Sequence, residues 1–296
     1  MTSPTPGMPS PTTSAPQLDL DPLMPAATAA KAEDIGVRKA KMAAGPMFLL
    51  AVLAGAFIAL AAAFSTTVLA GAGEALPFGL ARLVAGVTFS LGLILVVLGG
   101  AELFTGNNLI AVAWASRHVT TTAVLRNWTI VWVGNLVGAL ATAVLIVFAG
   151  QYEFGGGAVG QAALDIAAGK VALDPVRAFT LAILCNGLVC LAVWLTYSAR
   201  TTIDKVVVIV PPIAAFVAMG FEHSVANMYF IPVAILIRLV APESFWMDIG
   251  SSAEAYATVD FPGFVANITP VTLGNIVGGT ILVGAVYWLA HLRDVR

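Results

Sequence analysis

The chain has 296 residues, of which 59% are apolar and only 10% charged, and its formal net charge is −2. A water-soluble domain of this length does not need so apolar a composition, so we expect a lipid bilayer as the solvent. The near-neutral charge, with no basic stripe or tail, excludes a nucleic-acid partner.

The first 30 residues are rich in Pro, Ser, Thr and Ala and contain few large apolar residues. Such a segment cannot bury enough apolar surface to fold alone. We therefore expect residues 1–45 to form a disordered tail that leads into the first membrane helix.

Six apolar stretches follow, and each is long enough to span the hydrocarbon core, which takes about 20 helical residues. Because they are unbroken, they predict an all-α membrane protein and exclude an outer-membrane barrel, whose strands are short and alternating. The predicted spans are 47–69, 81–114, 128–149, 177–197, 205–240 and 264–290. They define a channel domain over 46–291, followed by a short tail at 292–296.

The second and fifth stretches are too long for one simple crossing. Each carries a polar cluster near its middle, at 102–108 and 222–227. We predict that both helices are broken at these clusters.

Orientation follows from the basic residues, because loops rich in Lys and Arg stay in the cytoplasm. With the amino terminus inside, ten basic residues fall on the cytoplasmic side and four on the other. The ten are Lys31, Arg38, Lys39, Lys41, Arg117, Arg126, Arg200, Lys205, Arg293 and Arg296; the four are Arg82, Lys170, Arg177 and Arg238. Both termini are predicted to be cytoplasmic.

Both cysteines, Cys185 and Cys190, lie in the fourth apolar stretch. Five residues apart on a helix, they point to different faces and cannot bridge each other. We interpret them as packing residues, and we expect no metal and no cofactor.

The two polar clusters repeat each other. The segments Gly100-Ala-Glu-Leu-Phe-Thr-Gly-Asn107 and Gly220-Phe-Glu-His-Ser-Val-Ala-Asn227 share Gly, Glu and Asn at positions 120 residues apart. A weaker echo joins Gly134-Asn-Leu-Val-Gly138 to Gly274-Asn-Ile-Val-Gly278. The alternative is chance, since Gly matches recur in helix-packing motifs, but a carboxylate at bilayer depth is costly and rare without a purpose.

Three spans in each half, 46–150 and 176–291, make the second half run upside down relative to the first. In an inverted repeat of this kind, the broken helices meet near the midplane and direct the partial charges of their ends at a polar substrate. A substrate pathway is therefore expected where the two clusters meet.

The segments Ala101–Asn107 and Gly220–Met228 resemble the two signature stretches of the formate/nitrite transporter family. The resemblance extends over about residues 31–291 and includes 127–135, Lys170, 185–186 and 267–275. It implies an aquaporin-like protomer of six helices with its own pore, assembled as a homopentamer in the bacterial inner membrane.

The resemblance also implies the roles of individual residues. His223 is the pore histidine, Thr105 the loop threonine facing it, and Lys170 the basic residue of the vestibule. Asn186 and Asn275 line the pore or support the histidine. The apolar constrictions fall at Phe89, Leu93, Phe104 and Phe216.

These residues suit the transport of a weak-acid anion. Moving a bare carboxylate or nitrite ion through an apolar constriction costs tens of kcal/mol at low dielectric, and one proton removes most of that cost. Histidine can give and regain a proton near neutral pH, so His223 is the expected donor. Glu222 and Glu102 either anchor loop backbone or, for Glu222, tune the histidine.

The predicted function is transport of small monovalent anions together with protons, with formate as the first candidate. Nitrite or hydrosulfide through the same pore is the alternative within transport. An integral-membrane enzyme is disfavoured because no nucleophile, nucleotide-binding or metal-ligand motif accompanies His223. A facilitator of neutral solutes would need neither Lys170 nor His223, and a satisfied core histidine remains the plain alternative for His223.

Overall fold

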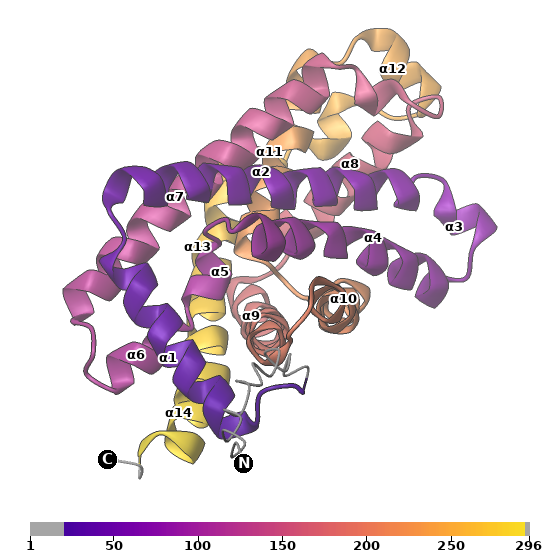
Figure 1. Ribbon diagram of the computed structural model, residues 1–296. Helices are drawn as coiled ribbons and strands as arrows, with labels where there is room; N and C mark the ends of the chain where they lie inside the picture. Colours follow the sequence, from indigo (N-terminus) through magenta and orange to yellow (C-terminus); the bar gives the residue numbers. More distant parts are fainter. Residues whose placement is uncertain (1–20, 294–296) are drawn as a thin grey trace, which may run out of the picture.

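The structure is a computed structural model that describes residues 21–293, and every regular element of this part of the chain is helical (Figure 1). In chain order the elements are α1 (Pro25–Lys41), α2 (Ala44–Leu69), α3 (Ala72–Ala75), α4 (Phe78–Gly99), α5 (Phe104–Asn107), α6 (Ile110–Ala115), α7 (Thr121–Phe148), η1 (Gln151–Glu153), α8 (Ala158–Val171), α9 (Pro175–Ser198), α10 (Thr202–Ala218), α11 (Ser224–Val240), α12 (Glu243–Asp248), η2 (Ala253–Tyr256), α13 (Phe261–Val277), the π-helix η3 (Gly278–Ala285) and α14 (Val286–His291).

Five helical segments in the described residues are long and apolar enough to cross a membrane. They are α2, α4, α7, α9 and the run from Ala253 to His291, while α11 is apolar but shorter. Large apolar side chains such as Leu145, Phe148 and Leu239 are exposed on their outer faces. A bilayer supplies the apolar surroundings that these side chains need, and the prediction of an all-helical membrane protein is confirmed.

Helix α1 lies inside the segment that the sequence analysis assigned to a disordered tail, so that prediction is wrong for residues 25–41. The helix buries a stripe of small residues that includes Ala29, Ala32, Gly36 and Ala40. Such residues bury little area, but they let helix backbones approach closely; a Cβ on Gly36 would stand 3.0 Å from the Ala113 Cβ. Residues 1–20 and 294–296 of the predicted tails lie outside the described residues.

The two predicted polar clusters lie where helices end and new ones begin. Helix α4 ends at Gly99, Gly100 takes a left-handed conformation with φ 71°, and α5 starts at Phe104. Likewise α10 ends at Ala218, Gly220 has φ 72°, and α11 starts at Ser224. Glycine adopts positive φ without the steric penalty of a Cβ, so each can follow a helix end where the chain turns.

Other helices that contact these turns pack closely against each other in two corresponding pairs. Helix α7 lies against α2, and α13 lies against α9. A Cβ on Gly138 of α7 would collide with the Val52 carbonyl, and one on Gly278 would collide with the Ile183 carbonyl. The weaker Gly-Asn echo in the sequence thus coincides with two close helix contacts.

Candidate functional site

His223 and Thr105 form a buried contact between the two interhelical turns. The His223 ring is at the start of α11, and its Nδ1 accepts the Ala226 N–H at 3.1 Å. Neutral imidazole has one donor and one acceptor nitrogen, so Nε2 carries the hydrogen. Nε2 lies 2.9 Å from Thr105 Oγ1 and therefore donates to it. The arrangement presents a neutral histidine with its exchangeable proton directed at Thr105.

Glu222, next to His223, is held by a cation and two amides, those of Lys170, Asn227 and Asn267. One carboxylate oxygen accepts from Lys170 Nζ at 2.8 Å, and the other accepts from Asn227 Nδ2 at 2.6 Å. Asn267 accepts from Asn227 at 2.7 Å and donates to the Lys170 carbonyl at 2.9 Å. A buried carboxylate needs such pairing, because an isolated charge in an apolar interior is too costly.

Glu102 has the same environment in the other turn. It accepts from Lys39 Nζ at 2.6 Å and from Asn107 Nδ2 at 2.7 Å. Asn127 accepts from Asn107 at 2.9 Å and donates to the Lys39 carbonyl at 3.1 Å. We call this set (Lys39, Glu102, Asn107, Asn127) the first carboxylate cluster and the matching set (Lys170, Glu222, Asn227, Asn267) the second carboxylate cluster.

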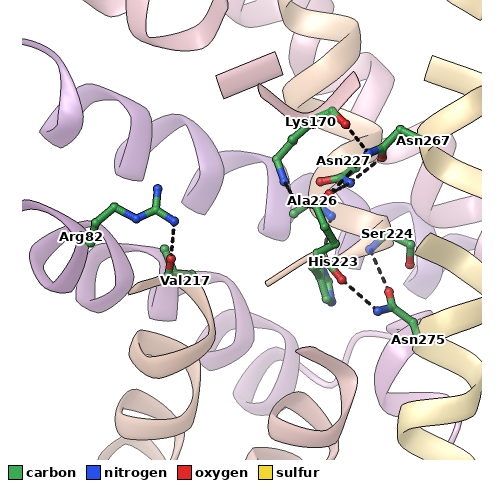
Figure 2. A network of polar contacts seen from close by, with 10 residues as sticks. Arg82, Lys170, Val217, His223, Ser224, Ala226, Asn227, Asn267 and Asn275 are labelled. Atoms are coloured by element: carbon green, nitrogen blue, oxygen red, sulfur yellow. Dashed lines mark hydrogen bonds and ion pairs between the residues drawn. The ribbon is translucent and has the colours of Figure 1, made fainter. Parts of the chain in front are cut away.

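Asn275 stabilises the backbone on both sides of His223. Its Oδ1 accepts the Ser224 N–H at 2.8 Å, while its Nδ2 donates to the Glu222 carbonyl at 3.0 Å and the Ala182 carbonyl at 2.8 Å. Buried backbone groups need partners of this kind. Figure 2 shows Asn275 reaching the turn from α13.

Asn135 does the same in the other turn. It accepts the Phe104 N–H at 2.9 Å and donates to the carbonyls of Glu102 at 2.9 Å and Ala51 at 2.7 Å. The two asparagines, 140 positions apart, therefore play corresponding parts.

Asn186 is fully buried on α9 and links the segment after the first turn to α13. Its Nδ2 donates to the carbonyls of Thr105 at 3.3 Å and Asn275 at 2.6 Å, and to Asn108 Oδ1 at 2.7 Å. These contacts place Asn186 among the groups that support Thr105.

Two cavities approach the His223–Thr105 contact. The first has a volume of about 540 Å³ and is lined by Lys170, Glu222 and His223, among others. The second, of about 180 Å³, is lined by Lys39, Glu102 and Gly106, the residue after Thr105. Each cavity therefore contains one carboxylate cluster's lysine and glutamate, and the histidine borders the larger one.

Aromatic rings border the larger cavity next to His223. The Phe89 and Phe216 rings meet edge to face with their centroids 5.6 Å apart, and Phe216 stacks on His223 at 5.8 Å. Leu93 lines the smaller cavity. Phe104 is buried, lines neither of these two cavities, and contacts Asn135 through its backbone N–H.

Sequence reasoning did not assign Lys39, Asn127, Asn267 or Arg82 to the site. Lys39 was counted only as a cytoplasmic charge, and the two asparagines only as parts of the family resemblance. A usable signal existed: Lys39 and Lys170 are 131 positions apart, as are Ala51 and Ala182, and Asn127 and Asn267 are 140 apart, as are Asn135 and Asn275. These pairs are missed when the two halves are compared only at the offset of 120 residues that relates the two turns.

Apolar helices around two cavities, the larger of which is lined by His223, define a membrane protein with polar groups in its interior. The chain belongs to the formate/nitrite transporter family, whose sequence model matches residues 26–289. This is a family of channels and transporters and not of enzymes.

Relatives and solved structures agree with this assignment. The chain is 46% identical to the formate channel FocA of Escherichia coli strain K12 over 275 residues, 93% of this chain and 96% of that one. It is 44% identical to the formate channel FocA of Haemophilus influenzae strain Rd over 254 residues, 86% of this chain and 89% of that one. A solved pentameric formate channel with formate bound is 47% identical and superposes with a TM-score of 0.80, covering 84% of this chain and 98% of that one.

Proposed function

We propose that this protein conducts formate across the membrane and that His223 protonates the anion on the way. The observation that carries this proposal is the His223–Thr105 contact, in which Nε2 of a buried histidine in the wall of the larger cavity lies 2.9 Å from the Thr105 hydroxyl. The similarity to formate channels over 93% of the chain supports formate as the substrate.

The larger cavity attracts the anion. Lys170, Arg82 and Arg177 lie in its wall, against two acidic residues, Asp165 and Glu222. Three basic and two acidic side chains leave the cavity wall with an excess of one positive charge. A cleft whose wall carries a net positive charge raises the local concentration of anions.

At the end of this cavity the anion meets His223 beside the Phe89 and Phe216 rings. A proton that His223 takes up from the larger cavity and passes on from Nε2 converts formate to formic acid and returns the imidazole to its neutral form; the neutral acid avoids the cost of carrying a bare charge past the rings and Leu93. Thr105 can hydrogen-bond the substrate without adding charge. Beyond Leu93 the acid enters the smaller cavity and releases its proton. Phe104 remains a predicted constriction residue.

The two glutamates anchor the turns in this mechanism. Both carboxylates are occupied by a lysine and an asparagine, which leaves them poorly placed to accept a proton from substrate. Asn275 and Asn186 act in support, the first on the backbone around His223 and the second on the Thr105 carbonyl.

We further propose that residues 46–291 form six spans in an inverted repeat, with the second and fifth helices broken at 100–103 and 219–223. The matching hydrogen bonds of the two carboxylate clusters and of Asn135 and Asn275 support this interpretation. The distribution of basic residues supports cytoplasmic termini in the bacterial inner membrane, and the pentameric solved relative supports a homopentamer.

Proteoliposome flux tests the proposal. Formate uptake should appear with the purified protein, acidify the lumen and respond to external pH, and His223→Asn should abolish the pH response. His118→Asn is the matched control, because that imidazole is 48% exposed and pairs with Glu33 away from the two cavities. Uptake of nitrite or hydrosulfide in preference to formate would reassign the substrate, and glycerol uptake unaffected by His223→Asn would overturn the mechanism.

A further inference from the structure

One face of α4 runs along α10 and ends at the aromatic rings beside His223. Arg82, Gly86 and Phe89 share this face, because residues four and seven positions apart lie above one another on a helix. Each of the three contacts α10 or the turn that it ends in. The position of Phe89 relative to Phe216 is therefore set by the contact between these two helices.

Arg82 binds the carboxyl end of α10. Its Nη2 donates to the Val217 carbonyl at 2.6 Å, and its Nε lies 3.5 Å from the Ala218 carbonyl. Figure 2 shows the guanidinium directed at Val217, across the view from Lys170. The last carbonyls of a helix lack partners within the helix and carry its partial negative charge. A guanidinium at this end therefore both donates hydrogen bonds to these carbonyls and interacts favourably with their charge.

The same turn leads directly to Phe216 and His223. Gly220 N–H donates to the Val217 carbonyl at 3.1 Å, and Phe221 N–H donates to the Phe216 carbonyl at 3.0 Å. Arg82 thus shares an acceptor with the turn that joins the Phe216 ring to the histidine. Moving the Val217 carbonyl would move both.

Helix α10 needs support from the side at this end. Pro211 and Pro212 lie inside it and lack backbone N–H groups, so its hydrogen-bond ladder is interrupted one turn before Phe216. Gly86 lets α4 approach there, because a Cβ on Gly86 would stand 2.5 Å from the Ala214 carbonyl oxygen. Arg82 is the charged end of this contact.

We propose that Arg82 is a specificity-determining positioning residue, which sets the width of the Phe89–Phe216 aperture by holding the carboxyl end of α10. This inference rests on the proposed formate transport and adds a residue to it. The site has no counterpart in the other half, where the residue 120 positions after Arg82 is the neutral Thr202.

The test is the ratio of acetate to formate flux in proteoliposomes, because a ratio does not depend on how much protein is folded. One extra methyl group is worth about 10- to 200-fold discrimination in a close-fitting site, so a loosened aperture should raise the acetate-to-formate ratio by about threefold or more. Arg82→Met should show this rise. Arg177→Met is the matched control: Arg177 lines the same cavity but is exposed on α9, and its side chain makes no hydrogen bond to α10 among the described residues.

A rise in Arg82→Met with an unchanged ratio in Arg177→Met supports the inference. An unchanged ratio in Arg82→Met overturns the inference. An equal rise in Arg177→Met also overturns it, because loss of a positive charge from the cavity wall would then be enough to raise the acetate-to-formate ratio. If Arg82→Met does not assemble, Arg82→Lys takes the same test with the same criteria, because an ammonium cannot reproduce the guanidinium fork. Absence of formate flux in the unsubstituted protein would contradict the proposed function instead.

Discussion

The two interhelical turns, taken with the first turn of the helix that follows each (residues 100–107 and 220–227), share their supporting hydrogen bonds and differ in one side chain. Each is held by one carboxylate cluster and by one asparagine from a neighbouring helix. At the position before the new helix, however, the first turn has Leu103 and the second His223.

This difference distinguishes the hydrogen bonds that make a polar turn stable inside an apolar protein from the side chain proposed to act on the substrate. The shared hydrogen bonds satisfy backbone groups and carboxylates that lipid could not solvate. The imidazole is found in one turn only, and its one hydrogen bond to the backbone is the one it accepts from the Ala226 N–H. Its other nitrogen faces Thr105, which follows the other turn. The supporting hydrogen bonds therefore occur in both turns, whereas the proposed proton donor occurs in one.

Moving the histidine gives the largest expected effect. In His223→Leu combined with Leu103→His, the imidazole would face the smaller cavity and lose Thr105, so formate flux should fall by about a hundredfold, the size of a typical acid–base contribution. Leu103→His alone retains His223 and should keep most of the flux. Near-normal flux in the double variant, measured in proteoliposomes, would mean that the two turns are interchangeable.

Removing one charge from either carboxylate cluster should mainly destabilise the fold. Glu222→Gln leaves Lys170 without its counter-charge, and breaking a buried pair costs about 3–5 kcal/mol. Glu102→Gln should cost less, because the Lys39 side chain is 23% exposed and that of Lys170 only 14%. Thermal unfolding in detergent measures the order, and an equal loss in both variants would contradict the argument from exposure.

A charge-free second cluster sharpens this comparison. Lys170→Met with Glu222→Gln leaves no unpaired charge and should regain most of the lost stability. The net charge of the cavity wall is unchanged, but Lys170 is also the basic residue next to the Glu222–His223 turn, so its loss should keep formate uptake low. Full recovery of uptake in this variant would remove Lys170 from that role.

The supporting asparagines should be equal in stability and unequal in function. Asn135→Ala and Asn275→Ala each remove the partner of one buried N–H and two buried carbonyls, at a cost of about 1–3 kcal/mol for each group that is left unsatisfied. Only Asn275 holds the backbone next to His223, so Asn275→Ala should reduce formate flux per folded protein more. Equal losses of formate flux in the two variants would mean that flux depends on the stability of both turns and not on the position of His223.

The smallest effect is expected at Thr105. Thr105→Val removes the acceptor of the His223 proton, and a hydrogen bond is worth about 0.5–1.5 kcal/mol net. Formate flux should therefore fall only a fewfold. Thr105→Ser keeps the hydroxyl and should behave like the unsubstituted protein; a loss in Thr105→Ser equal to that in Thr105→Val would assign the effect to packing.

Much of the fold could be predicted because it depends on local properties. The lengths of the apolar stretches predict where α2, α7 and α9 lie to within a few residues, except that α7 begins earlier, at Thr121. Gly100 and Gly220, each followed two residues later by a glutamate, mark the two turns at one offset. Helix α1 escaped prediction because it is amphipathic: its charged residues keep it from being an apolar stretch, and its packing face is made of small alanine and glycine residues.

The sequence by itself determined the solvent of this protein, its helical class and the two turns, because apolar length and glycine conformation act over short stretches of chain. Only the tertiary structure decided that Lys39 and Asn127 complete the first carboxylate cluster and that Arg82 donates a hydrogen bond to the carboxyl end of α10. Those contacts join residues far apart in the chain, at offsets that differ from one helix to the next, and they exist only once the helices have packed.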